Sequence, residues 1–300
     1  MGKIQVKKLQ TFLGHSNSIY ELKAYNEHQF FSAGSDGMVV KWDLKMPDEG
    51  EVVAKVEGSV FALALDTDNK HIFVGHNFEG VHKISLDTKK EVASVALGNH
   101  QIFSILTFGD FVLVGLSNGE LVVCNPELEV VTKLSYSKER IRNIHSFGDQ
   151  LALSHSDNVI RILGSDFRVQ HTLEGHKNSV FVSKYHPSGK YLASAGRDAQ
   201  LKIWDAEAGY VERESIPAHL YTINDLVFSK SGRHFVTVSM DKAVKLWDAH
   251  NFKLLKVLDK DRHAGHGNSV NRALWMDYQD LLVTCSDDRT ISVWEIADIE

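Results

Sequence analysis

One short pattern recurs along the chain and limits its fold more than any other feature. At four places an alternating run of apolar and polar residues ends in Trp followed by an acidic residue. These runs end at Trp42-Asp43, Trp204-Asp205, Trp247-Asp248 and Trp294-Glu295. Repetition of a unit of about 40 residues indicates a fold built from similar structural units, each of which buries its apolar face against the next.

Each copy carries further landmarks at fixed distances before its Trp. A His after Gly or Ala comes first, a Ser or Thr follows about eighteen residues later, an Asp stands four residues on, and the Trp six residues after that. The four sets are His15, Ser32, Asp36 and Trp42; His176, Ser194, Asp198 and Trp204; His219, Thr237, Asp241 and Trp247; and His266, Thr284, Asp288 and Trp294. In this frame the chain resembles the WD-repeat (WD40-type) β-propeller family.

Between Trp42 and Trp204 the Trp is missing, but turn pairs continue as Glu79-Gly80, Asn118-Gly119 and Asp157-Asn158. Five residues after these pairs, Ser85, Cys124 and Leu163 stand in place of Trp. Together with the four Trp residues, these three positions are spaced by 43, 39, 39, 41, 43 and 47 residues along the chain. The spacing predicts seven repeats, the second to fourth degenerate, and assigns residues 1–300 to a single seven-bladed propeller domain.

Short alternating apolar runs such as 60–65, separated by turn pairs such as Asp36-Gly37, are typical of β-strands. The expected fold is therefore all-β, with four-stranded antiparallel blades. Residues 4–12 form a strand-like run before the first Gly-His, whereas the seventh repeat is one strand short after Trp294. We expect the N-terminal strand to pair into the C-terminal blade and close the ring, because open sheet edges invite aggregation.

Composition excludes several classes of protein. A net charge of −6 disfavours general nucleic-acid binding, which usually requires a basic face. The N-terminus has no long apolar run, so neither a signal peptide nor membrane attachment is expected. Two cysteines, Cys124 and Cys285, are too few and too separated for a disulfide framework, which favours a reducing, cytoplasmic compartment. We expect a monomer when no partner is bound.

The Ser, His and Asp of each set invite comparison with a nucleophilic triad. A catalytic site is needed once, however, whereas this set occurs four times and always with a Trp. Trp only donates hydrogen bonds and an ionised Asp only accepts them, so the four side chains can form a directed series of hydrogen bonds from Trp to Asp. The family resemblance implies that this tetrad is a structural relay. The blades without complete tetrads are expected to be softer.

Other site chemistry is sparse. The chain has no phosphate-binding loop, dinucleotide motif or Cys-x-x-Cys, so no cofactor is expected. Of sixteen histidines, four belong to the tetrads and only His263 and His266 form a close pair. Zinc sites need three or four converging ligands, so no metal site is expected. An enzyme would need an unrecognised active site at the channel mouth.

In the family that the chain resembles, the face carrying the Gly-His loops commonly docks peptides and proteins. Positions flanking the first apolar residue after Gly-His, and the position before the tetrad Asp, reach the channel mouth on that face. They supply the candidate partner-binding residues Tyr20, Phe61, Phe103, Arg140, Arg142, Phe181, Arg197 and Met240. Aromatic and Arg side chains dominate interface energetics, although the Phe residues could instead pack between blades.

The arginines point to an acidic or phosphorylated segment as ligand, since guanidinium groups bind carboxylate and phosphate oxygens in pairs. A solvated charge cluster explains them almost as well. The sequence thus predicts a non-catalytic scaffold for a protein or peptide partner. The alternatives are a propeller enzyme and a structural subunit of a larger complex.

Overall fold

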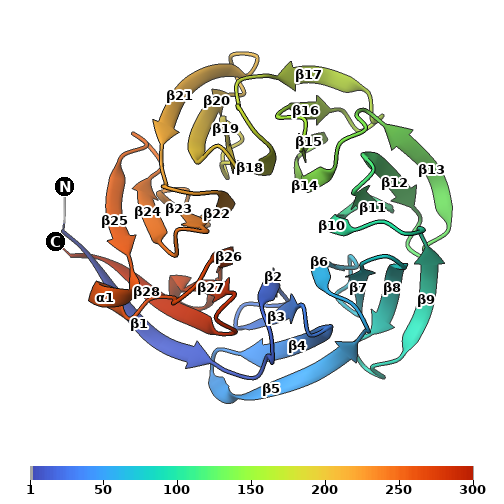
Figure 1. The fold of residues 1–300 in the computed structure, drawn as a ribbon, viewed down its shortest axis with the longest axis horizontal. Helices are drawn as coiled ribbons and strands as arrows, with labels where there is room; N and C mark the ends of the chain where they lie inside the picture. Colours follow the sequence, from blue (N-terminus) through green and yellow to red (C-terminus); the bar gives the residue numbers. More distant parts are fainter. Residues whose placement is uncertain (1–2, 300) are drawn as a thin grey trace.

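The computed structural model describes residues 3–299 and shows seven four-stranded antiparallel sheets, arranged as blades around a central channel (Figure 1). The all-β, seven-bladed propeller predicted from the repeats is confirmed. In each blade the first strand lies nearest the channel, and the fourth lies on the outer rim.

The blades follow one another along the chain. Blade 1 consists of β2 (Ile19–Ala24), β3 (Gln29–Gly34), β4 (Met38–Asp43) and β5 (Met46–Lys55), and blade 2 of β6 (Val60–Leu65), β7 (His71–His76), β8 (Gly80–Ser85) and β9 (Glu91–Ala96). Blade 3 consists of β10 (Ile102–Phe108), β11 (Phe111–Leu116), β12 (Glu120–Cys124) and β13 (Val130–Ser135), and blade 4 of β14 (Ile141–Phe147), β15 (Gln150–His155), β16 (Ile160–Leu163) and β17 (Val169–Leu173). Blade 5 consists of β18 (Val180–Tyr185), β19 (Tyr191–Gly196), β20 (Gln200–Asp205) and β21 (Val211–Pro217), and blade 6 of β22 (Ile223–Phe228), β23 (His234–Ser239), β24 (Val244–Asp248) and β25 (Leu254–Leu258).

Blade 7 joins the two ends of the chain. It contains β26 (Val270–Trp275), β27 (Leu282–Ser286) and β28 (Ile291–Ile299), and its outer strand is β1 (Lys3–Phe12). β1 runs antiparallel to β28, with Phe12 opposite Ile291. Phe12 is buried, and its ring centroid lies 5.3 Å from that of Trp42 in blade 1. The predicted closure of the ring by the N-terminal strand is confirmed.

The core lies mainly between adjacent blades, because both faces of each inner sheet are covered by a neighbour. One cluster, for example, packs Ala193 and Ile203 of blade 5 against Phe235 and Trp247 of blade 6. Fully buried strands need apolar residues on both faces, which explains runs such as 60–65. This packing makes each blade a rigid support for the loops at its ends.

The register predicted for blade 2 is wrong by one residue. In blade 1 the Gly37 N–H donates to the Gly34 carbonyl, and Trp42 follows five residues after Gly37. The corresponding bond in blade 2 runs from the Glu79 N–H to the His76 carbonyl, which puts Ile84, not Ser85, at the Trp position. The Glu79-Gly80 pair misled the prediction, since Gly80 is the first residue of β8 and the positive φ of this turn falls earlier, on Phe78 (φ 68°). Cys124 and Leu163 do occupy the Trp positions of blades 3 and 4.

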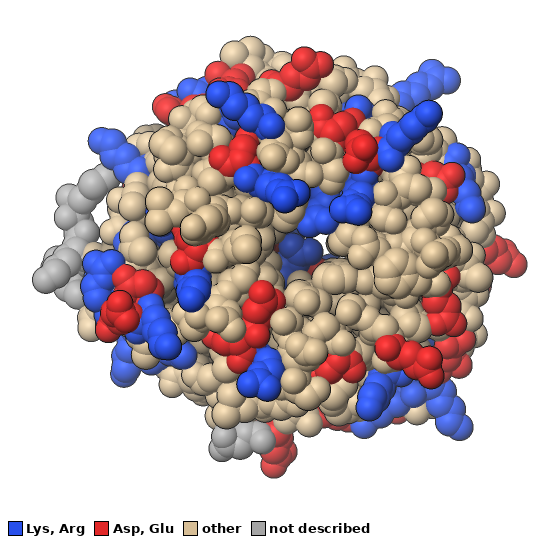
Figure 2. Space-filling view, in the orientation of Figure 1, with Lys and Arg blue, Asp and Glu red and all other residues tan. Residues whose placement is uncertain are grey.

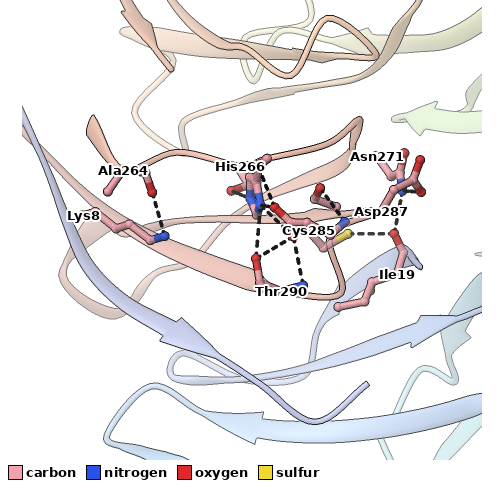
Figure 3. Close-up of polar contacts among 12 residues, drawn as sticks. Lys8, Ile19, Ala264, His266, Asn271, Cys285, Asp287 and Thr290 are labelled. Carbon is pink, nitrogen blue, oxygen red and sulfur yellow. Dashed lines mark hydrogen bonds and ion pairs between the residues drawn. The ribbon is translucent and has the colours of Figure 1, made fainter. Parts of the chain in front are cut away.

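Within residues 3–299, two short helical turns interrupt the strands. The helix α1 (Lys260–His263) precedes β26 and accounts for the longest repeat, and the 3-10 turn η1 (Tyr278–Asp280) lies between β26 and β27. α1 is followed by Ala264, whose carbonyl accepts a hydrogen bond from Lys8 Nζ at 2.9 Å, which fastens the insertion to β1 (Figure 3). No helix within residues 3–299 is long and apolar enough to cross a membrane.

Candidate functional site

The structure brings the four members of each tetrad together. In blade 6, Trp247 Nε1 donates to Thr237 Oγ1 at 2.9 Å. The same oxygen lies 2.7 Å from His219 Nε2, and His219 Nδ1 lies 2.9 Å from Asp241 Oδ2. The same chain of contacts connects Trp42, Ser32, His15 and Asp36; Trp204, Ser194, His176 and Asp198; and Trp294, Thr284, His266 and Asp288.

Each relay ties the loop before a blade to the turn between its second and third strands. The Asp241 carboxylate also accepts the backbone N–H groups of Leu220 and Ala243. Burial alone would raise the pKa of Asp241, but hydrogen bonds from His219 and these N–H groups outweigh it and lower the pKa to about 2. Burial lowers the pKa of His219.

The relays do not resemble working nucleophilic sites. Ser32, Ser194, Thr237 and Thr284 are fully buried, and each hydroxyl oxygen is shared between a Trp and a His. A nucleophile must reach its substrate, whereas these hydroxyl groups lie inside the blades. The geometry supports the structural role.

Apolar residues replace the relay hydroxyl in blades 2 to 4. Val74, Val114 and Leu153 occupy that position, one on the second strand of each blade, and all three are fully buried. Blade 4 still retains an acidic residue at its turn, Asp157. The Oδ2 atom of Asp157 accepts a hydrogen bond from Arg161 at 2.7 Å. In these blades, apolar packing therefore replaces most of the hydrogen bonds of the relay.

A ring of side chains surrounds the channel mouth on the face that carries the relay loops, called here the upper face. Its members are Tyr20, Phe61, Phe103, Arg142, Phe181, Asn224 and Asn271, which with Arg272 line a cavity of about 190 Å³. Each ring residue lies at a break in the pairing between the first and second strands of its blade. A β-bulge re-aims a side chain, and here it turns seven side chains toward the same opening.

Aromatic rings and one guanidinium form a continuous arc within this ring. The Tyr20 and Phe61 rings stack with centroids 4.5 Å apart, and Phe103 follows 5.7 Å from Phe61. The Arg142 guanidinium carbon lies 4.4 Å from the Phe103 centroid and 3.9 Å from that of Phe181. Tyr20, Phe61 and Phe103 therefore contact one another around the mouth, Phe181 contacts Arg142, and all four rings remain partly exposed. Such a surface can stack against a flat or apolar group.

Amide side chains complete the ring where blades 6, 7 and 1 meet. Asn271 Nδ2 donates to the Ile19 carbonyl of blade 1 at 2.9 Å and to Asp287 at 2.8 Å (Figure 3). Cys285 is buried and also donates to the Ile19 carbonyl, and neither Cys285 nor Cys124 forms a disulfide. These contacts fix the ring across the junction of the two chain ends.

Positive charge gathers at one side of the mouth. Arg142 lies at the opening, and Arg140 and Arg197 are exposed on the neighbouring turns. Figure 2 shows Lys and Arg side chains crowded beside the central hollow. Burial, together with repulsion from Arg272, Arg140 and Arg197, lowers the pKa of Arg142 to about 10. Within residues 3–299, the guanidinium groups of Arg140, Arg142 and Arg197 have no hydrogen bond or ion pair with the protein, which leaves them open to an anionic group.

Below the ring, polar side chains form hydrogen bonds between neighbouring blades. Ser104 Oγ accepts the Ile144 N–H at 3.0 Å, and Asp225 Oδ2 accepts the Ala273 N–H at 3.1 Å, in each case from the next blade. Arg272 Nε donates to Glu21 Oε2 at 3.2 Å. These groups line a second cavity, of about 300 Å³, inside the channel. Their bonds to the protein make them part of the scaffold.

Met240 lies apart from the ring, exposed on the upper turn of blade 6. The structure adds two neighbours that were not predicted from the sequence, Leu220 and Tyr221, which are 84% and 61% exposed. A signal was present, since the residues after His15, His176 and His266 are polar or Gly, whereas those after His219 are Leu and Tyr. Large exposed apolar side chains that gather together often mark a contact surface.

Comparisons with known proteins agree with this architecture. A family model described as WD domain, G-beta repeat (WD40) matches residues 6–43, 167–205, 211–248 and 253–295, more than half of the chain. A solved structure of the WD40 beta propeller domain of Doa1 superposes with a TM-score of 0.85 at 16% identity and covers 97% of both chains. That likeness shows the fold alone.

Two curated proteins are similar in sequence. The 66 kDa stress protein of Physarum polycephalum is 23% identical over 96% of this chain and 48% of its own length. The nuclear distribution protein PAC1 of Coprinopsis cinerea is 40% identical over 42% of this chain and 28% of its own length. The chain thus spans about half, or less, of the length of these relatives.

Proposed function

The chain belongs to the WD40 repeat family, and from that premise we propose that it is a non-catalytic scaffold that binds a peptide or protein partner on its upper face. The ring around the channel mouth carries this proposal. It combines partly exposed aromatic side chains, held by bulges on rigid strands, with unpaired arginines. Aromatic and Arg side chains are frequent hot spots of interfaces, and rigid aromatic anchors lose little conformational entropy on binding.

The bound segment is an acidic or phosphorylated one. Arg140, Arg142 and Arg197 repel one another at the mouth, which is part of the reason why the pKa of Arg142 falls to about 10. A carboxylate or phosphate between them would remove that repulsion and would accept charge-assisted hydrogen bonds. The ligand's apolar groups would then contact Tyr20 and Phe61, and those of a larger partner would reach Met240.

The comparisons support the scaffold role at a coarse level, because the WD40 repeat model matches more than half of the chain. The printed names of the two relatives describe a stress protein and a nuclear distribution protein. For this chain we propose a cytoplasmic location, in keeping with its free, buried cysteines, and a monomeric state when no partner is bound. These proposals rest on the chain's own residues.

Site-directed crosslinking tests the position of the partner site. A photoreactive phenylalanine analogue is placed at Phe61 or Phe181, and as a control at His186, which follows β18 at the opposite end of its blade. Irradiation in extract of the native host should trap the same partner from both upper-face positions and not from position 186. The combined Tyr20→Ala, Phe61→Ala, Phe181→Ala and Arg142→Ala variant, checked by melting to be folded, should lose that partner.

The alternatives make different predictions in the same experiment. A partner captured only at position 186 or on the outer strands would favour a structural subunit that docks elsewhere. Absence of any partner together with turnover of a substrate would favour an enzyme. Either result would overturn the upper-face scaffold.

Salt dependence and charge-only variants test the acidic ligand. Affinity for the trapped partner should fall steadily with added salt, and Arg140→Met, Arg142→Met and Arg197→Met should each weaken it. Arg168→Met is the matched control, because Arg168 is also exposed but pairs with Asp166 on the rim. An affinity indifferent to salt and to these three substitutions would contradict an acidic ligand while leaving the aromatic site intact.

A further inference from the structure

The β7–β8 hairpin of blade 2 brings together three residues that are typical metal ligands. His76 ends β7, Glu79 lies in the turn, and His82 is the third residue of β8. One potential ligand atom from each of the three residues lies within 4.8 Å of the other two. No metal site is predicted here from the sequence, because no Cys pair or close His pair marks these positions.

Strand register explains the convergence. Val74 of β7 pairs with His82 of β8, and His76 lies two residues beyond Val74. Residues two apart on a strand share a face, so the two histidines are diagonal neighbours across the ladder. Their ring centroids are 5.6 Å apart. The turn then returns Glu79 over His76, with Glu79 Oε2 2.5 Å from His76 Nδ1.

His82 is oriented in the way that metal-binding histidines usually are. Its Nδ1 lies 2.8 Å from Glu91 Oε2 on the next strand, β9, and donates to that carboxylate. A neutral imidazole that donates from Nδ1 carries its lone pair on Nε2. His82 Nε2 is buried and has no hydrogen-bond partner within the described part of the chain. A carboxylate behind a histidine fixes the ring and raises its basicity as a ligand.

The site is open to ions from solution. His76, Glu79, His82 and Glu91 line a surface pocket of about 470 Å³. The side chains of His76 and His82 are 12% and 15% exposed, whereas that of Glu79, which pairs with His76, is 57% exposed. Two imidazoles and one carboxylate with an open position form a donor set that suits Zn²⁺.

At this location, a bound ion would stabilise the β7–β8 turn. Blade 2 has none of the relay residues, and its turn places Phe78, at positive φ and exposed, where the relay blades carry Asp. We propose that His76, Glu79 and His82 bind a divalent transition-metal ion, for which Zn²⁺ is the best match, and that this ion fastens the β7–β8 turn in the blade that lacks a relay. The inference does not depend on the proposed partner site.

A second cluster in the same blade lacks these features. Asp66, Asp68 and His71 also lie close together, but both oxygens of Asp66 accept hydrogen bonds from His71 or from backbone N–H groups. Asp68 pairs with Lys70. These side chains are occupied in shaping the β6–β7 turn, so His71 provides a matched control.

Zinc titration of the purified, chelator-treated protein tests the proposal. Calorimetry should show one Zn²⁺ per chain for the wild type and for His71→Ala, and no binding for His82→Ala. Glu91→Gln, which removes only the orienting carboxylate, should weaken binding about 10- to 100-fold. Glu79→Gln changes an exposed side chain and should weaken binding without affecting folding.

Two further readouts keep the test decisive. Zn²⁺ should raise the melting temperature of the wild type and of His71→Ala but not of folded His82→Ala, because binding to the native state alone stabilises it. Bound Co²⁺ should give the intense visible bands of a four-coordinate site. Absence of binding by the wild type, or equal weakening by His71→Ala and His82→Ala, would overturn the site. If His82→Ala does not fold, unchanged binding by Glu79→Gln and Glu91→Gln would overturn it.

Discussion

At the scale of single residues, His219 occupies the middle of a buried chain of hydrogen bonds. Its substitution by Ala would leave Thr237 and Asp241 without their shared partner. A buried group that loses its partner costs about 1–3 kcal/mol. We expect His219→Ala to lower the free energy of unfolding by this amount in urea titrations, whereas His250→Ala, at an exposed loop position, should change it little. Equal stability of the two variants would show that the relay does not stabilise blade 6.

His155 is fully buried in blade 4. Burial, with the Arg161 guanidinium nearby, lowers the pKa of His155 to about 4 from its ordinary value of 6.5. Between these values the unfolded chain binds a proton that the folded chain does not, so stability falls as pH decreases from 6.5 to 4.

The matching substitution for this test comes from blade 3, where Leu116 occupies the position of His155. His155→Leu should make the dependence of the unfolding free energy on pH shallower by up to about 1.4 kcal/mol per pH unit between pH 6.5 and 4. Denaturant unfolding at several pH values measures this slope. An unchanged slope would mean that His155 is protonated in the folded state.

At the scale of elements, the relays distinguish the blades. Hydrogen exchange should proceed first in blades 2 to 4, because their turns lack the bonds that hold the loops of the other four blades. Mass spectrometry should detect deuterium in β7 and β8 before β23 and β24, the corresponding strands of blade 6. Earlier exchange in β23 and β24 would contradict this order. Saturating Zn²⁺ should slow exchange in β7 and β8 selectively if the metal site exists.

The closing strand permits a second prediction at this scale. Deleting residues 1–12 would remove β1 from β28 and would also remove Phe12 from its contact with Trp42. The exposed β28 edge and the lost core side chain should lower the melting temperature and promote association. Adding a peptide with the sequence of residues 1–12 should restore part of the loss. A truncated chain that stays monomeric with unchanged melting would show that closure contributes little.

At the scale of the whole molecule, the closed ring gives every blade four strands. The outer strands still carry exposed apolar residues such as Val131 and Val211, but charged residues accompany them, as in Glu212-Arg213-Glu214 of β21. Charges on edge strands discourage pairing between molecules. We therefore expect light scattering on a size-exclusion column to give the monomer mass of 33.7 kDa. A stable dimer would indicate that one of these edges is an interface.

Much of this architecture follows from local sequence. The relay residues of one blade lie within about 30 positions of one another, so their spacing along the chain already reflects their spacing in the blade. Alternation along strands and turn pairs such as Asp36-Gly37 and Asn118-Gly119 locate the strands and hairpins between them. The register of blade 2 was not predicted correctly, because Gly80 lies in β8 rather than in the turn, so that the Glu79-Gly80 pair marks a position one residue too late.

The sequence by itself therefore determined the repeat number, the strand content, the closure of the ring and the identity of the relay residues, since each depends on contacts within one repeat or between the chain ends. The family resemblance already placed the ring positions at the channel mouth, and only the tertiary structure decided that Arg142 lies there between two Phe rings. Only the structure also placed His76, Glu79 and His82 together. Both arrangements depend on exact strand register and on contacts between separate strands or blades, and a one-residue slip in register would point these side chains elsewhere.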